Sequence, residues 1–420
     1  MLALAVRRGT RVDRAPNRPA SSESLTMYRG TNDEKATDSG DASMERAVED
    51  RSVEASAQRQ AGMHGRDRDQ AKQVRNDPMR RFVATPHSAS LPVMGHAVRL
   101  ETNCSKLLKT MVELFSCYPE APTECPAFLW RIVVEFDGQA VGPWPQRSAF
   151  CDDGLRWAQF GQRNFLAVDL EAREAIAFVS ERLIEDELGF TSPFLDNLLC
   201  LTAGSLGLVP LWANCVAHEH RGVLLFGKPN NGKTSASYLA KKLGLEFYAD
   251  EGVFLELESG LLRGWGGFWP PTFRPEALEF FTELKERTSP CFHRNFVVHH
   301  LMRDARSSSR SPVQPICCLF LERQSSASLG LSRITRDDLA RLLAGSVLFQ
   351  DDDRFLGQQT RVLHALEVLP AYVLRYGHDP AVAAAVAQDL LAADDHIEND
   401  QELLAAKNVG GTSPLPSAQI

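Results

Sequence analysis

Apolar positions divide the chain into a polar start, a patterned middle and a polar end. Residues 1–90 are rich in charged and polar side chains and hold few aromatics, so they cannot bury enough apolar surface to offset the entropy of ordering. The pattern therefore predicts four parts: a disordered tail over 1–90, a small α/β domain over 91–190, a second domain over 191–396 and a flexible C-terminal tail over 397–420.

Both patterned domains combine strand-like and helix-like segments. In the first, we expect a helix at 105–115 and strands at 97–103, at 128–136 and in two parts within 163–180. The second alternates short, continuous apolar runs with segments of helical spacing, as parallel strands covered on both faces do. Its predicted strands are 222–226, 245–249, 316–322 and 371–376, with a hairpin of 253–257 and 261–266. Its predicted helices are 194–209, 234–243, 337–343 and 380–393.

The stretch GKPNNGKT, between a predicted buried strand and a predicted helix, fits the phosphate-binding pattern G-x-x-x-x-G-K-[ST]. Gly227 lets the chain leave the strand sharply, and Gly232 permits a close backbone approach, so that successive N–H groups form an anion nest at a helix N-terminus. Lys233 is expected to reach the β- and γ-phosphates and to act in catalysis, and the Thr234 hydroxyl to ligate magnesium. The pattern predicts binding of a nucleoside triphosphate, ATP, with Mg²⁺ through Gly227, Lys228, Pro229, Asn230, Asn231, Gly232, Lys233, Thr234 and Ser235. The alternative is a glycine-rich turn with an incidental lysine.

Two adjacent carboxylates, Asp250 and Glu251, follow the next predicted strand. A carboxylate at a strand end beside a phosphate-binding loop holds the metal or accepts a proton from a substrate hydroxyl. We therefore expect both residues to be metal ligands and Asp250 also to be catalytic. A solvated acidic turn is the alternative.

Composition narrows the function classes. The chain has 420 residues, a net charge of -8, 44% hydrophobic and 24% charged residues, which is ordinary for a soluble protein and argues against a general nucleic-acid binder. No apolar run approaches the roughly 18 residues of a membrane-spanning helix. The nine cysteines show no CxxC spacing, which favours buried thiols in a reducing cytosol and a cytoplasmic location.

The segment 222–266 resembles the HPr kinase/phosphorylase family, whose core is shared with nucleotide-dependent phosphoenolpyruvate carboxykinases. The likeness rests on the strand and loop GVLLFGKPNNGKT, on the acidic pair where the family has two aspartates, and on Arg263-Gly264-x-Gly266, which is similar to the family's R-G-x-G signature. The stretch LPAYVLRYGHDP with the Ala-rich helix after it also resembles the relatives' last strand and helix, so the likeness spans roughly 195–395. The resemblance implies an α/β fold with a P-loop kinase core of this type.

By the family's logic, Asp250 is the base toward a substrate hydroxyl and Glu251 assists magnesium, although the opposite assignment stays open. Arg263 either contacts phosphate or braces its hairpin; the resemblance places it among the nucleotide-binding candidates.

The sequence also departs from the family pattern. Where the family has a histidine before the first strand, this chain has Trp212 nearby, and Leu261 stands where a glutamate precedes the signature. Gln314 replaces the arginine expected in the basic loop that PVQP at 312–315 faintly resembles. These departures argue against the phosphorylase reaction and against HPr as the substrate.

Other side chains have competing interpretations. Arg274 either closes over a nucleotide or caps a turn, and the aromatic group Trp265, Phe268 and Trp269 either stacks on a ligand or, as we favour, packs in the core. Three further groups are expected in exposed turns or loops: His218 with His220, His299 with His300, and Asp351–Asp353.

These observations favour an ATP-dependent kinase that transfers the γ-phosphate to a hydroxyl, with a serine of a protein or peptide preferred over a small-molecule acceptor. The alternative is a nucleotide-binding regulatory module with little or no turnover. A carboxykinase ranks last because its additional metal-binding His and Lys residues are not found. The acceptor is unknown, and a homo-oligomer is possible because the family forms ring assemblies.

Overall fold

A computed structural model describes most of the chain between residues 83 and 393, and the described residues from 84 onward belong to one compact unit. Gaps in the described part fall at 123–125, 136–146, 153, 161–163, 187–188, 294–295, 302–309, 325–328 and 349–352. The predicted tails lie outside the described residues, except that the first strand begins at His87, inside the range assigned to the N-terminal tail. The division at 190/191 stays a prediction. Among described residues, no helix is both long and apolar enough to cross a bilayer.

The N-terminal part is built on a mixed seven-stranded sheet with the order β1-β2-β3-β7-β6-β5-β4. The pairs β2–β3 and β3–β7 are parallel, and the other neighbours are antiparallel. The strands are β1 His87–Val93, β2 His96–Thr102, β3 Phe128–Glu135, β4 Arg147–Asp152, β5 Leu155–Phe160, β6 Asn164–Asp169 and β7 Glu174–Ser180. The predicted helix α3, Ser105–Phe115, lies in the connection between the parallel strands β2 and β3, which needs a crossover.

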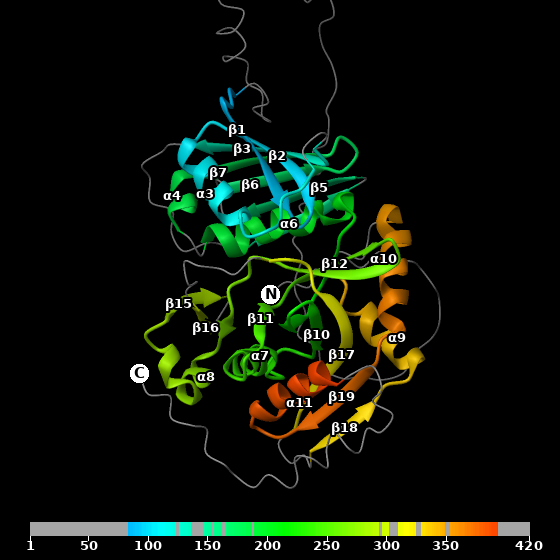
Figure 1. The fold of residues 1–420 in the computed structure, drawn as a ribbon. Helices are drawn as coiled ribbons and strands as arrows, with labels where there is room; N and C mark the ends of the chain where they lie inside the picture. Colours follow the sequence, from blue (N-terminus) through cyan, green and yellow to red (C-terminus); the bar gives the residue numbers. More distant parts are fainter. Residues whose placement is uncertain are drawn as a thin grey trace, which may run out of the picture. The chain divides into compact units, whose positions relative to one another are not determined.

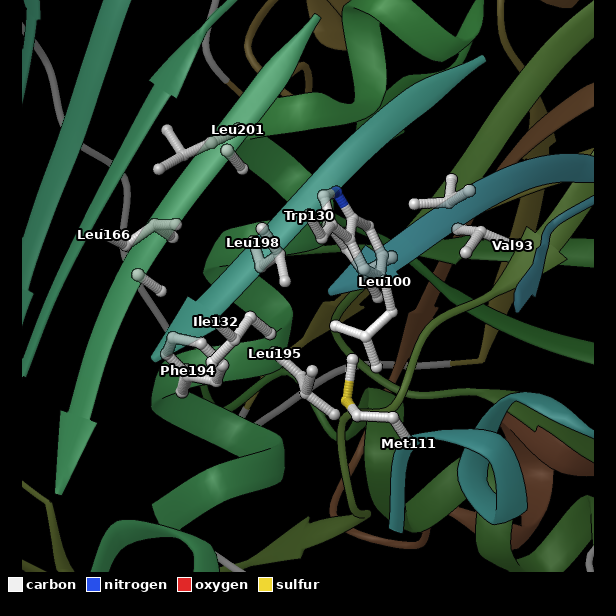
Figure 2. Close-up of a cluster of buried hydrophobic side chains, with 14 of the residues drawn as sticks. Val93, Leu100, Met111, Trp130, Ile132, Leu166, Phe194, Leu195, Leu198 and Leu201 are labelled. Atoms are coloured by element: carbon white, nitrogen blue, oxygen red, sulfur yellow. The ribbon is translucent and has the colours of Figure 1, made fainter. Parts of the chain in front are cut away.

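One face of this sheet is covered by a chain of short helices. A helix α4, Glu181–Glu185, precedes the π-helix η1 Phe190–Leu195, the α-helix α6 Asp196–Thr202 and the 3-10 helix η2 Ala203–Leu206. The segment 194–209, for which we expected a single α-helix, thus passes through three helical conformations: π, α and 3-10. The last of them ends at Gly207, whose φ is 79°. Figure 2 shows the resulting core, in which side chains from the strands and from α3 face those of η1 and α6: Val93, Leu100, Met111, Trp130, Ile132, Leu166, Phe194, Leu195, Leu198 and Leu201.

The C-terminal part is centred on a six-stranded sheet with the order β11-β9-β10-β17-β19-β18 (Figure 1). Its strands are β9 Asn214–His218, β10 Arg221–Phe226, β11 Glu246–Ala249, β17 Gln314–Arg323, β18 Gly330–Arg333 and β19 Ala371–Tyr376. Neighbours β10, β17 and β19 are parallel, so their carboxyl ends meet at one edge.

Helices cover both faces of this sheet, which explains the continuous apolar run of β10. The helices α7 Lys233–Lys242 and α11 Ala381–Ala392 lie side by side and share a core with Val223 and Leu225. Residues of α9 Arg336–Ala344 and α10 Asp353–Glu367 pack with Leu224 and Phe226 on the opposite face. Asp353 therefore begins a helix and does not lie in the loop we expected, while Asp351 and Asp352 lie outside the described residues.

Two three-stranded sheets complete the described fold. The first has the order β13-β12-β8, with β8 Val209–Leu211, β12 Val253–Glu258 and β13 Leu261–Gly266, so the predicted hairpin is confirmed. The second has the order β14-β16-β15, with β14 Thr272–Phe273, β15 Thr288–His293 and β16 Phe296–Leu301, and is accompanied by α8 Pro275–Phe280 and η3 Thr282–Leu284. The expectation of an exposed turn at His299–His300 is wrong, because both lie in β16 and the His300 side chain is buried.

Candidate functional site

The loop between β10 and α7 has a backbone that only glycine can adopt without strain at two of its positions. Gly227 and Gly232 have φ values of 148° and 80°, and Asn230 also has a positive φ of 71°. A Cβ added to Gly227 would lie 2.8 Å from the carbonyl oxygen of Leu321, and one added to Gly232 would collide with the Tyr376 hydroxyl. These two glycines are therefore required by close packing as well as by conformation.

Side chains from the loop and from β19 hold the loop against the carboxyl ends of β17 and β19. The Asn231 Nδ2 donates to the Leu321 carbonyl at 2.6 Å, and the Tyr376 hydroxyl donates to the Asn231 carbonyl at 2.6 Å. Burial raises the pKa of Tyr376 to about 12, so this hydroxyl stays a donor at neutral pH. Lys228 and Pro229 are at the tip of the loop, where Pro229 is exposed, and Ser235 is half-buried on the first turn of α7.

Lys233 folds back onto its own loop. Its Nζ donates to the Gly227 carbonyl at 2.8 Å and lies 5.2 Å from the ring centroid of Trp212. The side chain is buried, and this burial lowers its pKa, although the charges of Glu251 and Asp250 act in the opposite direction. An ammonium held by the Gly227 carbonyl, by a longer contact of 3.5 Å with the Lys228 carbonyl and by one ring face is only partly compensated for its lost water, so an arriving phosphate would be a better partner.

Asp250 lies directly after β11 and is buried against three donors. Its Oδ1 accepts from the Thr234 hydroxyl at 2.9 Å and from the Asn214 amide at 2.5 Å, and its Oδ2 accepts from the Thr272 backbone N–H at 3.0 Å. Burial, and then the charge of Glu251, raise the pKa of Asp250 to about 7 in spite of these bonds. The structure thus brings together the predicted residues Thr234 and Asp250.

Glu251 is half-buried next to Asp250 and has a φ of 56°, which is unfavourable for a residue with a side chain. Its backbone N–H donates to the Asn214 Oδ1 at 3.1 Å. Asn214 is a site residue that the sequence reasoning missed. A usable signal was present, because Asn214 is a polar residue directly before the short apolar run Cys215–Ala217 of a buried strand.

The residues present suit magnesium only if a phosphate completes the coordination. Within the described ranges, no group of three or more His, Cys, Asp or Glu residues could hold a metal. Magnesium, however, is commonly bound by one or two carboxylates together with substrate phosphates and waters. The hydroxyl of Thr234 and the carboxylates of Asp250 and Glu251 fit that donor set.

The remaining candidates lie in other surroundings. Arg263, on β13, forms an ion pair with Glu258 of the same hairpin, which corresponds to the bracing role; its contact with phosphate stays a prediction. Arg274 is exposed immediately before α8. The turn at His218 and His220 is exposed, as expected.

The aromatic group, with Trp265 near the end of β13 and Phe268 and Trp269 after it, packs in the core, as we favoured. The Phe268 ring lies 4.8 Å from that of Phe115 in an edge-on arrangement, and the Trp265 ring lies 6.1 Å from that of Tyr118. Trp269 stacks on the core residue Phe254.

Comparisons with known proteins add little to this geometry. Neither a protein-family model nor a curated protein matches the chain. Among solved structures, it is similar to the Hpr(Ser) kinase/phosphatase from Coxiella burnetii, with 11% sequence identity and a TM-score of 0.22 over 43% of this chain and 88% of that chain. A score this low carries no argument about function, so the function has to be inferred from the residues of the site.

Proposed function

We propose that the 227–234 loop binds the polyphosphate of a nucleoside triphosphate, ATP in the first instance, together with Mg²⁺. The observation that carries this proposal is the hydrogen bond between the Thr234 hydroxyl and the Asp250 carboxylate at the start of α7. Thr234 lies in the first turn of that helix, where backbone N–H groups without helical partners favour an anion. A metal-binding hydroxyl and a carboxylate are therefore adjacent to a place suited to phosphate.

Lys233 would supply the positive charge for this phosphate. Its ammonium would exchange two backbone carbonyls and the Trp212 ring for charged oxygens, which are stronger acceptors. Mg²⁺, held by Thr234 and Asp250 with Glu251 beside them, would neutralise charge on the transferring phosphoryl group.

The reaction we propose is transfer of the γ-phosphate to a hydroxyl, with a serine of a protein or peptide as the preferred acceptor. Three hydrogen-bond donors already fix the orientation of the Asp250 carboxylate beside Thr234. A carboxylate held in this way is suited to bind the metal ion. Glu251 is more accessible and is the better placed of the two to accept the proton of an acceptor hydroxyl. This is the opposite of the assignment taken first from the family resemblance.

A nucleotide-binding regulatory module is a second candidate. The contact between Lys233 and Trp212 favours it, because an aromatic ring that cannot exchange protons lies beside the lysine where the resembling family has a histidine. Both candidates require nucleotide binding and differ only in turnover.

Calorimetric titration with ATP and Mg²⁺ tests the binding step. We expect heat from the native chain, a large loss of affinity in Lys233→Ala, and native behaviour in Lys241→Ala, which removes an exposed lysine from the same helix. No heat from ATP or GTP with the native chain would overturn the proposal.

Incubation with γ-labelled ATP, Mg²⁺ and a host lysate then separates the two candidates. A labelled protein or small molecule that disappears with Asp250→Asn and Glu251→Gln supports the kinase. Binding without any labelled acceptor supports the regulatory module.

A further inference from the structure

Asn214 connects three parts of the site although it lies outside the loop and the acidic pair. It is the first residue of β9 and pairs with Leu225 near the end of β10, so it lies beside the strand from which the loop departs. Its side chain is completely buried. A buried amide among apolar neighbours is costly unless its polar atoms are hydrogen-bonded.

Both polar atoms of the Asn214 side-chain amide form hydrogen bonds. The Nδ2 donates to the Asp250 carboxylate at 2.5 Å and to the Ser237 hydroxyl at 3.3 Å, while the Oδ1 accepts from the Glu251 backbone N–H at 3.1 Å. The backbone N–H can only donate, so the amide oxygen must face Glu251 and the amide nitrogen must face Asp250. The orientation of this side chain is therefore set by the chemistry of its partners.

The two ends of the amide act on different features of the acidic pair. The nitrogen fixes the carboxylate of Asp250 at the same oxygen that accepts from Thr234. The oxygen holds the main chain of Glu251 in its left-handed conformation, which is unfavourable for a residue with a Cβ. Through Ser237, which donates to the Lys233 carbonyl at 3.0 Å, the same amide is connected to α7.

We propose that Asn214 is a positioning residue that holds the Asp250 carboxylate and the Glu251 main chain beside Thr234, so that a magnesium–nucleotide complex binds more tightly than the nucleotide alone. This inference rests on the proposed nucleotide site, and it adds a residue that neither the loop pattern nor the acidic pair contains. Replacement of Asn214 removes no hydrogen bond of the 227–232 loop and none of the Lys233 side chain, so we expect it to act on the metal-dependent part of binding.

The test compares Asn214→Leu and the smaller polar variant Asn214→Ser with Thr288→Val. The control removes another buried hydrogen-bonding side chain, whose hydroxyl donates to the Leu284 carbonyl away from the loop. ATP affinity is measured by calorimetry with Mg²⁺ and with EDTA. In the Asn214 variants we expect the affinity in EDTA to stay within about twofold of the native value and the gain from Mg²⁺ to fall roughly tenfold or more, as removal of a group that orients metal ligands does.

A second readout needs no nucleotide. Amide hydrogen exchange of a peptide that covers 248–253 should become faster in the Asn214 variants, because the Glu251 N–H loses its acceptor, and should stay native in Thr288→Val. If the native chain binds no nucleotide, the proposed function fails while this readout still judges whether Asn214 holds the pair. Native exchange at 248–253, or a native gain from Mg²⁺ in either folded variant, would overturn the inference.

Discussion

We predict that the ionised carboxylate of Asp250 lowers the free energy of unfolding of the ligand-free protein. Its removal should therefore stabilise the fold. Burial first, and the neighbouring Glu251 charge second, raise the pKa of Asp250 from 3.8 to about 7. At about 1.4 kcal/mol for each factor of ten in the acid constant, ionised Asp250 costs roughly 4 kcal/mol of folding free energy above pH 7. Asp250→Asn removes the charge with almost no change in shape.

The substitution also introduces a local conflict. The new amide oxygen can still accept from Thr234 and Asn214. The amide nitrogen then faces the Thr272 N–H, and because both groups are donors, no hydrogen bond forms between them. That conflict costs about 1–3 kcal/mol, so we expect a net stabilisation of roughly 1–3 kcal/mol at pH 8.

The sign of the pH dependence follows from the direction of the pKa change. Because the folded chain binds the Asp250 proton more tightly than the unfolded chain, the native protein gains stability as the pH falls from about 7 towards 4. The variant does not titrate there, so its advantage should shrink by roughly 2–3 kcal/mol between pH 8 and pH 5.

Urea unfolding of the native chain, Asp250→Asn and the control Glu279→Gln at several pH values measures these differences. Glu279 is exposed on α8, so its variant should follow the native protein. The reasoning is refuted if Asp250→Asn is less stable than the native chain at pH 8 and the difference does not change with pH. If the expected stabilisation is found together with lost magnesium-dependent binding, the carboxylate is retained for function at the expense of stability.

Three further outcomes are expected from the site and its surroundings. Gly232→Ala should lower the free energy of unfolding by about 1–2 kcal/mol from the left-handed backbone alone, and by more from the collision with the Tyr376 hydroxyl, as measured by denaturant unfolding, and should abolish ATP binding in calorimetry. Trp212→Phe should remove most of the change in tryptophan fluorescence on addition of ATP and Mg²⁺, because Lys233 leaves the indole ring; an unaltered change would contradict the proposed movement. Phe268→Ala should cost about 3–5 kcal/mol in denaturant unfolding yet leave ATP affinity native in the folded fraction, whereas lost affinity would favour base stacking over packing.

Local patterns predicted the regular elements well where the surroundings agreed with them. The helix 105–115 was predicted to the residue, because its buried side chains recur at a spacing of four. The strand β9 was missed because its apolar run, Cys215–Ala217, is only three residues long and lies between the polar Asn214 and His218. His300 was misjudged because a pair of histidines has no apolar signature, although its Nδ1 lies 3.0 Å from the Thr272 hydroxyl in a buried sheet.

The loop at 227–234 could be recognised from sequence because its requirements are local. Glycine at positive φ, a lysine and a hydroxyl at the start of a helix depend on consecutive residues and on the strand and helix that flank them. The set of hydrogen-bond donors around the Asp250 carboxylate has another origin. Asn214, Thr234 and Thr272 reach this carboxylate from separate elements, and their meeting depends on strand order and register, which no local pattern encodes. The sequence by itself therefore determined where phosphate is expected to bind, and only the tertiary structure decided which groups surround the carboxylate beside it.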